Sequence, residues 1–412
     1  MPLRIPTTEL QPGMKLRESI LASGRVMLQG QRALTSADIN VLRRRYPSLT
    51  VLIEDPILDC LVDFEDDSHE RRIADEAQRR VSQCMSGLYD RFAERASLRD
   101  VQFGVLQSTV NELIEYLKAN PVSAALVASC LDSSNYLGAH AGNVFFLGML
   151  LGASTLDYVA TERRRKIRAR GVRHGFATDL APLGLAAMMC DLGMLPHQNL
   201  LKTTRQLTLE ESETIRRHPL AGAAMLPESF SSVARVAVKT HHENMCGTGY
   251  PARLPGEELH VFARILRIAD AFDAATSERV YRGAKSPARV LWEMTAGPFA
   301  CFYDAELMEA FGGLIQPFPI GSKLRLSDGR YAAVVKYNRR DPFDPVVIIA
   351  FDAQDRALPR EQLEGPLQIG HRRGLRIASL RGEDLSFIYT MRPSQETHTR
   401  ERFVTPLQAA YP

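Results

Sequence analysis

The chain has 412 residues, of which 45% are hydrophobic and 24% charged, and its formal net charge is +3. This length predicts more than one domain, and the composition is that of a globular protein rather than a disordered one. Because a net charge this small excludes a strong overall attraction for polyanions, the chain is not expected to bind a nucleic-acid polymer.

The cysteines and the hydropathy pattern predict a cellular location. Six cysteines are spread along the chain without a CxxC pair, which fits a reducing compartment. We find no apolar core of signal-peptide length at the N-terminus and no run of about 18 apolar residues, so no membrane span is predicted. We therefore expect a cytoplasmic protein.

The first two predicted segments are a small module and a connector. Residues 1–65 combine short apolar runs, a helix that begins at Thr35 and extends through Leu42, and a strand over Leu49–Ile53, which together predict a small α+β module. Residues 66–120 carry apolar positions at helical spacing and are interpreted as connecting helices. A homodimer through these helices is a hypothesis, although no heptad pattern is sustained over them.

The remaining segments change from helical to strand-like patterns. Residues 121–315 are helical almost throughout, whereas 316–392 predict a small β-rich module and 393–412 a disordered tail. The predicted strands are Ile320–Leu326, Tyr331–Tyr337, Val346–Phe351 and Phe387–Thr390. The predicted fold is therefore mainly α, with a helical bundle between two small flanking modules.

An ordered series of histidines and aspartates lies in the helical region. Its members are His140, Asp191, His218, His241, His242 and Asp270. Helices of a bundle can project such side chains to one point, and imidazoles and carboxylates are ligands of iron, manganese and zinc. A lone histidine is more often a hydrogen-bonded core or surface residue. Adjacent helical residues point about 100° apart, so the histidine pair serves one site only near a helix end or between two metals.

Five segments of the helical region, taken in order, resemble the motifs of one family. They are YLGAHAGNV, CDLGMLP, RRHPLAGAAML, HHENMCGTGYP and ILRIADAFDAATSERVYRGAKSP. This series is similar to that of the HD-GYP family, the bacterial cyclic dinucleotide phosphodiesterases of the HD hydrolase superfamily. The resemblance implies an HD-domain helical bundle around a centre of two or three metal ions, usually iron or manganese.

The resemblance also implies roles for individual residues. Asp191 would be catalytic and would bridge two ions held by His140, Cys190, Asp191, His218, His241, His242 and Asp270. The substrate, cyclic di-GMP, would be opened to pGpG or GMP and contacted by Arg279, Arg282, Gly247, Gly249 and Tyr250. Asp273 is expected to brace its helix rather than bind metal, because a three-residue offset turns it about 60° from Asp270.

The sequence departs from the family pattern at four positions. Cys190 replaces the histidine of the HD pair, Met194 replaces a lysine that contacts phosphate, and Cys246 replaces the usual aspartate of the glycine-rich loop. Tyr136 replaces the acidic residue that some members place before the first histidine, which argues against a third metal ion.

Three interpretations of Cys190 are open. It is a thiolate ligand, or an inert thiol beside a weakened first site, or the mark of a domain that holds one metal ion or none and only binds. Two functions follow: a phosphodiesterase of reduced activity, or an inactive module that binds cyclic di-GMP or a signalling partner. Cys190 and Cys246 also suggest a redox-sensing thiol pair. The basic run 163–166, continued by Arg168, Arg170 and Arg173, is interpreted as a solvated helix or loop face. The alternatives are a docking surface for an acidic partner and a lid that contacts a dinucleotide.

Overall fold

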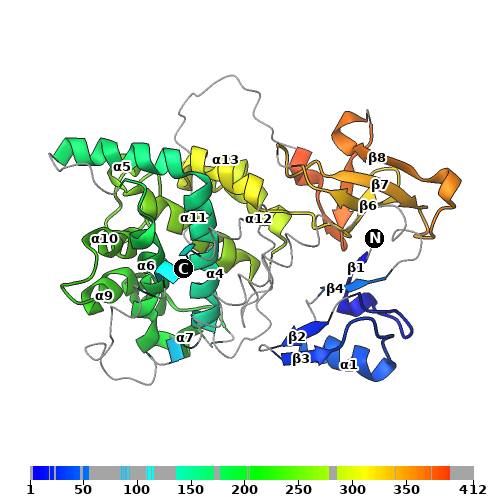
Figure 1. Cartoon of the computed structure of the whole chain (residues 1–412), viewed down its shortest axis with the longest axis horizontal. Helices are drawn as coiled ribbons and strands as arrows, with labels where there is room; N and C mark the ends of the chain where they lie inside the picture. Colours follow the sequence, from blue (N-terminus) through cyan, green and yellow to red (C-terminus); the bar gives the residue numbers. More distant parts are fainter. Residues whose placement is uncertain are drawn as a thin grey trace.

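The structure is a computed structural model that describes most of the helical region and parts of both flanks. The described residues are 3–17, 19–22, 25–46, 50–54, isolated positions between 85 and 115, 136–170, 177–201, 203, 205–277, 285–338, 340–372 and 374–389. The tail and most of the predicted connecting helices lie outside them. The described residues form a helical domain, a C-terminal sheet and a small N-terminal module (Figure 1).

The N-terminal module contains two short antiparallel ladders and one helix. Its elements are β1 (Leu3–Pro6), η1 (Thr7–Glu9), β2 (Ile20–Ala22), β3 (Arg25–Leu28), α1 (Ser36–Arg45) and β4 (Thr50–Ile53). β1 pairs with β4, and β2 pairs with β3. The predicted start of α1 is confirmed, because Thr35 and Asp38 each accept a hydrogen bond from the other's backbone nitrogen and so form a capping box.

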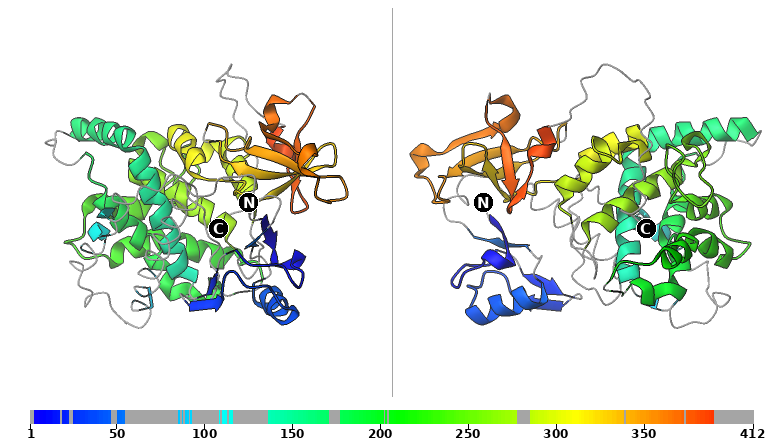
Figure 2. Two further views of the ribbon diagram at one scale, coloured as in Figure 1. Left: turned by 45° about the vertical axis from the view of Figure 1, so that its right-hand side comes forward. Right: turned by 180° about the vertical axis from the view of Figure 1, so that it is seen from behind.

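The helical domain surrounds a pair of central helices. Its elements are α4 (Tyr136–Ser154), α5 (Leu156–Arg170), α6 (Ala181–Met189), η5 (Leu192–His197), α7 (Gln198–Leu201), α8 (Leu209–Arg216), α9 (His218–Met225), α10 (Ser232–Thr240), η6 (Gly256–Glu258), α11 (Val261–Thr276), α12 (Pro287–Thr295), η7 (Ala300–Phe302) and α13 (Ala305–Leu314). α4 packs against α6 and α11, and α10 packs against α6, α9 and α11 (Figures 1 and 2).

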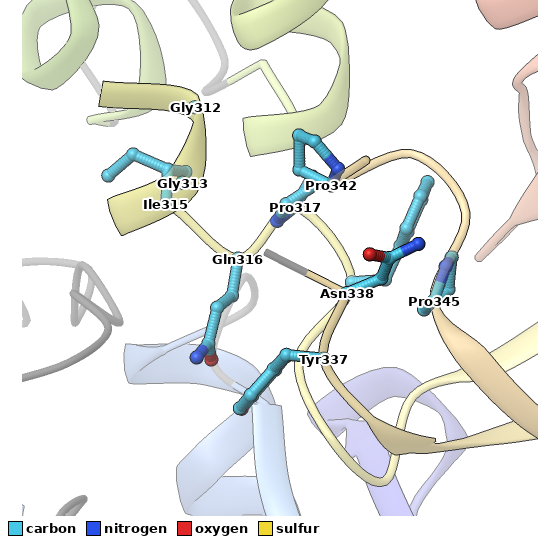
Figure 3. Close-up of a pocket in the computed structure, with 10 residues that line it drawn as sticks. Gly312, Gly313, Ile315, Gln316, Pro317, Tyr337, Asn338, Pro342 and Pro345 are labelled. Carbon is cyan, nitrogen blue, oxygen red and sulfur yellow. The ribbon is translucent and has the colours of Figure 1, made fainter. Parts of the chain in front are cut away.

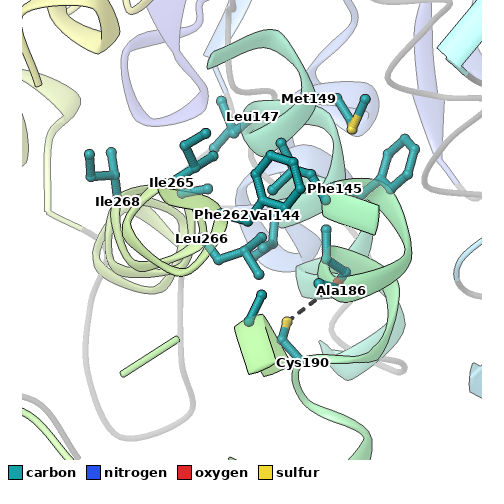
Figure 4. Close-up of a cluster of buried hydrophobic side chains, with 14 of the residues drawn as sticks. Val144, Phe145, Leu147, Met149, Ala186, Cys190, Phe262, Ile265, Leu266 and Ile268 are labelled. Atoms are coloured by element: carbon teal, nitrogen blue, oxygen red, sulfur yellow. Dashed lines mark hydrogen bonds between the residues drawn. The ribbon is translucent and has the colours of Figure 1, made fainter. Parts of the chain in front are cut away.

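The central helix α4 is apolar on nearly every side. By length and composition alone, Leu137–Ser154 could cross a membrane, but 83% of this window is buried within the fold. Val144 and Phe145 face apolar residues of the neighbouring helices, including Phe262 and Leu266 of α11 (Figure 4). A helix that is apolar all round is expected at the centre of a large core.

The next helix, α5, carries the basic run and divides it between core and solvent. Arg163 is buried, and its guanidinium donates to the carbonyl oxygens of Ala177 and Asp179 and lies over the ring of Phe262. Arg164 and Arg165 are exposed. The interpretation of this run as a solvated face therefore holds for Arg164 and Arg165 but is wrong for Arg163.

The C-terminal region is one antiparallel sheet in the order β10-β9-β5-β6-β7-β8. Its strands are β5 (Lys323–Leu326), β6 (Tyr331–Lys336), β7 (Val346–Phe351), β8 (Glu364–Gln368), β9 (Ile377–Leu380) and β10 (Glu383–Asp384), with η8 (Arg360–Gln362), η9 (Ile369–His371) and η10 (Ser386–Tyr389) between or after them. The predicted strand over Phe387–Thr390 is wrong. The carboxylate of Asp384 accepts hydrogen bonds from the backbone and hydroxyl of Ser386, which turns the chain into η10.

The N-terminal module and the C-terminal sheet share a second hydrophobic core. Apolar residues of both regions, such as Leu42 and Phe318, belong to one buried cluster, which Ala288 of α12 also joins. Trp292 of α12 packs on Phe387 with ring centroids 4.9 Å apart. The helical domain is therefore connected to the sheet through α12 (Figure 2).

A hollow lies where α13 leads into the sheet. Gln316, Tyr337, Asn338 and the prolines around them line it (Figure 3). Its accessible volume of about 20 Å³ holds one or two water molecules and is far too small for a dinucleotide. A substrate site must therefore be sought elsewhere in the described structure.

Candidate metal centre

Three helix boundaries and two helix interiors bring the predicted histidines and aspartates together. His140 lies on α4 and Asp270 on α11, and these two helices pack directly on each other. The other members sit where helices begin or end: Asp191 follows α6, His218 starts α9, and His241 and His242 follow α10. The expectation that the adjacent pair needs a helix end agrees with this placement, since α10 ends at Thr240.

These side chains form two groups with metal-ligand spacing. One group contains Asp191, His218, His241 and His242, and the other contains His140, Asp191 and Asp270; within each group the ligand atoms lie within 4.8 Å of one another. Asp191 belongs to both. Its Oδ2 lies 3.2 Å from His140 Nε2 and its Oδ1 lies 3.4 Å from His218 Nε2, so its two oxygens face the two groups.

The ring nitrogens of His218 and His241 face each other in a way that calls for a cation. His218 Nδ1 lies 2.7 Å from the carbonyl oxygen of Ile215, and His241 Nδ1 lies 2.6 Å from that of Val238. A carbonyl only accepts, so both Nδ1 atoms carry protons and both Nε2 atoms present lone pairs. These Nε2 atoms are 3.2 Å apart. Two such lone pairs repel each other unless a proton or a metal ion lies between them.

The second group is oriented by a further carboxylate. His140 Nδ1 donates to Asp273 Oδ2 at 2.6 Å, and Asn143 Nδ2 donates to the other oxygen of Asp273 at 2.7 Å. His140 Nε2 then points between Asp270 Oδ1, 3.1 Å away, and Asp191. Asp273 thus orients the imidazole of another helix, which is the support that metal-binding histidines receive in proteins.

The pKa values favour the protonation states that metal binding requires. Burial, against the attraction of Asp191, lowers the pKa of His218 to about 4. Burial and the neighbouring His241 lower the pKa of His242 well below its ordinary value. Burial opposes ionisation of Asp191, but the interactions with His140, His218 and His241 together hold the pKa of Asp191 below its usual range. At neutral pH His218 and His242 are therefore neutral and Asp191 and Asp270 are ionised, and this donor set fits a divalent metal.

The glycine-rich loop covers one side of the first group, which contains His218, His241 and His242. The ring of Tyr250 stacks on His242 with centroids 4.6 Å apart, and the guanidinium of Arg216 lies over Tyr250 at 4.9 Å. Gly247 has a φ of +71°, and a side chain on Gly249 would collide with the backbone of residues 242–244. The hydroxyl of Tyr250 is buried without a hydrogen-bond partner among the described residues, so it is available to a ligand.

Two arginines near the site were not identified from the sequence. Arg267 Nε donates to Asn244 Oδ1 at 2.9 Å, and its NH1 lies 3.9 Å from Asp270 Oδ2. Arg216 lies beyond Tyr250. Both lie within motifs that were recognised, RRHP and ILRIAD. Their positive charge within these motifs was the feature that could have marked them as phosphate-binding candidates. The predicted phosphate ligands Arg279 and Arg282 lie outside the described residues.

The family departures occupy distinct positions. Cys190 lies in the apolar core, and its thiol donates to the carbonyl oxygen of Ala187 at 3.3 Å, with Asp191 Oδ2 4.0 Å away (Figure 4). Burial raises the pKa of the Cys190 thiol well above its ordinary value. Cys190 thus lies outside both groups, although the resemblance placed it among the ligands. Met194 is also buried.

The other replaced position lies apart from Cys190. Cys246 is exposed, and among the described residues the thiol in contact with it is that of Cys301 rather than that of Cys190. The hypothesis of a sensing pair formed by Cys190 and Cys246 therefore finds no contact to support it, because Cys190 bonds within the core. Tyr136 is the first residue of α4, the helix that also holds His140.

Comparisons with known proteins agree with this geometry. Residues 174–307 match the profile of the HD domain family. A cyclic di-GMP phosphodiesterase of Pseudomonas aeruginosa is 30% identical over 185 residues, which are 44% of this chain and 44% of that protein. A 3'3'-cGAMP-specific phosphodiesterase of Vibrio cholerae is 36% identical over 102 residues, which are 24% of this chain and 22% of that protein.

A solved structure is also similar. An HDG"Y"P protein of Bdellovibrio bacteriovorus aligns over 76% of this chain and 98% of its own, with 15% identity and a TM-score of 0.42. The matched segments span less than half the length of both curated relatives. The profile match falls on the helical domain that holds the histidines and aspartates, and together with the curated relatives it supports the assignment of this domain to the HD-GYP family.

Proposed function

We propose that this protein is a metal-dependent phosphodiesterase that opens cyclic di-GMP to pGpG or GMP. The observation that carries the proposal is the pair of ligand groups that share Asp191. In each group, imidazole nitrogens and carboxylate oxygens converge at the spacing of metal ligands. The names of the relatives, several of which are cyclic di-GMP phosphodiesterases, support the choice of substrate.

The residues that would hold metal are those of the two groups. His140, Asp191 and Asp270 would hold one ion, and Asp191, His218, His241 and His242 a second. Iron or manganese suits this mixture of nitrogen and oxygen donors. Bound ions would polarise the phosphodiester and lower the pKa of the water that attacks phosphorus. Asp191 would act as the shared catalytic carboxylate.

The substrate would approach from the side of the glycine-rich loop. There Tyr250 presents a buried hydroxyl that has no partner among the described residues, and Arg216 and Arg267 bring positive charge near the ligand groups. Guanidinium groups pair well with phosphate oxygens. These two arginines would offset the loss of the lysine that Met194 replaces, together with Arg279 and Arg282 as predicted.

The fate of Cys190 supports reduced activity. Its thiol is protonated and bonded within the core. The ion that His140, Asp191 and Asp270 would hold therefore lacks one protein ligand. The same observation favours the second candidate function, an inactive module that binds cyclic di-GMP or a signalling partner. The two candidates differ in turnover and not in fold.

The experiment is anaerobic turnover by the full chain reconstituted with ferrous iron or manganese. Cyclic di-GMP and 3'3'-cGAMP are supplied separately, and products are resolved by chromatography. We expect pGpG or GMP from the parent, none from Asp191→Ala, and higher metal occupancy and faster turnover from Cys190→His. If the parent is inactive and Cys190→His is active, the natural protein is the binding module. If neither variant binds metal or turns over, the proposal is wrong.

A further inference from the structure

Two exposed thiols meet beside the metal centre. The Sγ atoms of Cys246, in the glycine-rich loop, and Cys301, in η7, are 3.6 Å apart although 55 residues separate them in sequence. The backbone N–H of Met245 donates to the carbonyl oxygen of Phe302 at 2.9 Å, so a hydrogen bond joins the two segments at the residues next to the two cysteines. Both cysteines are free and open to solvent.

The two thiols are chemically unequal. The Cys301 thiol donates to the Cys246 sulfur, and the hydroxyl of Thr248 lies 3.1 Å from the same sulfur. The hydrogen bond from Cys301 lowers the pKa of Cys246 to about 6 and raises that of Cys301. One accessible sulfur is therefore poised as a thiolate nucleophile beside a protonated neighbour, the arrangement that oxidisable dithiols share.

We propose that Cys246 and Cys301 form a reversible disulfide when the protein meets a hydroperoxide. The Cys246 thiolate attacks the O–O bond: an S–O bond forms, the O–O bond breaks, and the released oxygen leaves as hydroxide and takes a proton. Cys301 then attacks the resulting sulfenic acid, so that an S–S bond forms, the S–O bond breaks and water leaves. Two thiols and one hydrogen peroxide yield one disulfide and two water molecules.

Little movement is needed for this bond. A disulfide requires sulfurs about 2.0 Å apart, so the two Sγ atoms must approach by about 1.6 Å, within reach of side-chain rotation combined with a small loop shift. Cys190 offers a contrast within the same protein, because its thiol is buried and bonded to Ala187. A buried, protonated thiol reacts slowly with peroxide.

The bond would tie the glycine-rich loop to η7. The loop places Tyr250 on His242, and η7 leads into α13, so oxidation would fix the loop over the first ligand group. Any effect of oxidation on phosphodiester turnover rests on the proposed function. Formation of the disulfide between Cys246 and Cys301 does not depend on that function. The chemistry of the thiols is therefore tested without an activity assay.

The test is peptide mapping of the reduced full chain after brief treatment with hydrogen peroxide. Free thiols are blocked with iodoacetamide, and tryptic cleavage after Lys239, Arg253, Arg289 and Lys323 gives the peptides 240–253 and 290–323. We expect these two peptides to be linked, the link to disappear with dithiothreitol, and the yield to be unchanged in Cys190→Ser. The linked pair should be absent from Cys246→Ser and Cys301→Ser, whose folding is checked by circular dichroism.

Two results would overturn the proposal. One is Cys246 oxidised to sulfinic or sulfonic acid while Cys301 stays free. The other is a disulfide from Cys246 to a cysteine other than Cys301. Neither depends on whether the protein hydrolyses a cyclic dinucleotide, so failure here is distinguishable from failure of the proposed function.

Discussion

At the scale of single residues, the metal centre depends on which nitrogen of each imidazole carries the proton. Backbone carbonyls fix this choice for His218 and His241, and Asp273 fixes it for His140. Each ring is thereby held with Nε2 directed at the other ligands.

Replacing the carboxylate behind His140 tests this view. Asp273→Asn keeps the size of the side chain and a hydrogen-bond partner for Asn143. It removes the negative charge that orients the His140 ring and makes its Nε2 a stronger metal ligand. We expect the affinity for Mn²⁺ to fall by roughly 10- to 100-fold, the usual effect of losing such a partner. Calorimetric titration of the chelator-treated protein measures it. Asp384→Asn, a change in the sheet, is the control, and equal affinities in parent and Asp273→Asn would refute the role.

Acid should weaken the metal-free protein through the same histidines. The pKa of His218 is about 4 in the folded state and near 6.5 when unfolded, so between these values only the unfolded chain binds the proton. Stability is therefore full above about pH 6.5 and lost as the pH falls towards 4, by about 3 kcal/mol. Urea unfolding with chelator present measures this loss.

A matched variant isolates the contribution of His218 to this pH dependence. His218→Asn keeps a donor for the Ile215 carbonyl but does not titrate, so its stability should vary less between about pH 6.5 and 4. His242, whose pKa is also lowered, leaves a residual slope. An Asn variant with the same pH dependence as the parent would show that His218 is not the group responsible.

Much of this residue-level description was accessible from the sequence. The spacing of His140, Asp191, His218 and Asp270 within known motifs predicted that they converge, and the structure brings them together. The sequence could not show that Asp273 supports His140, because that contact joins residues 133 positions apart on different helices. For the same reason nothing in the sequence singled out Cys301.

At the scale of elements, close backbone contact between η5 and α9 positions two ligands. A Cβ on Gly193 would lie 2.2 Å from the carbonyl oxygen of His218, whereas a Cβ on Gly222 would lie 3.0 Å from Gly193 N. Asp191 immediately precedes η5, and His218 begins α9. Any side chain at position 193 must therefore push one ligand away from the other.

The two glycines form a matched pair for experiment. We expect Gly193→Ala to destabilise the protein by roughly 2–3 kcal/mol and to weaken metal binding, as overpacking against an unyielding backbone does. Gly222→Ala should cost less, because its contact is nearer to an ordinary one. Thermal unfolding and Mn²⁺ titration of both variants decide the matter, and an equal or larger effect at Gly222 would contradict this packing argument.

Strands were predicted where apolar residues form runs and missed where they do not. β6 and β7 are buried along most of their length and were found, whereas β8, with the sequence EGPLQ, has no buried residue, lies at an edge of the sheet and contains Pro366. Proline is tolerated at such an edge, where one side needs no backbone donor. Local pattern cannot identify a strand that exists only because a neighbour pairs with it.

At the scale of the whole molecule, α12 connects the helical domain to the sheet. Trp292 packs on Phe387, and Arg289 lies over the same ring at 3.7 Å while pairing with Glu383. Residues 1–65 and 316–392 were expected to be separate modules, and their shared apolar cluster is a long-range contact that periodicity does not reveal.

The single tryptophan of the chain makes this connection measurable. We expect Phe387→Ala to destabilise the sheet by about 3 kcal/mol and to shift the emission of Trp292 to longer wavelength, because water reaches the indole. Phe351→Ala removes a buried ring of the same sheet over which Lys323, rather than Trp292, is placed, with its Nζ 4.6 Å from the ring centroid. It should cost similar stability without the native-state shift. An unchanged spectrum in Phe387→Ala would argue against this contact.

The shared core also sets an order for events on the ribosome. Ile53 emerges early, yet Phe318 and the strands that complete its apolar cluster are translated only after the entire helical domain, roughly tens of seconds later at ~5–20 residues per second. The residues of the helical core all lie between these two positions in the chain. The nascent protein can therefore close its metal-binding centre first, while the apolar side chains of its N-terminal module await those of the C-terminal sheet.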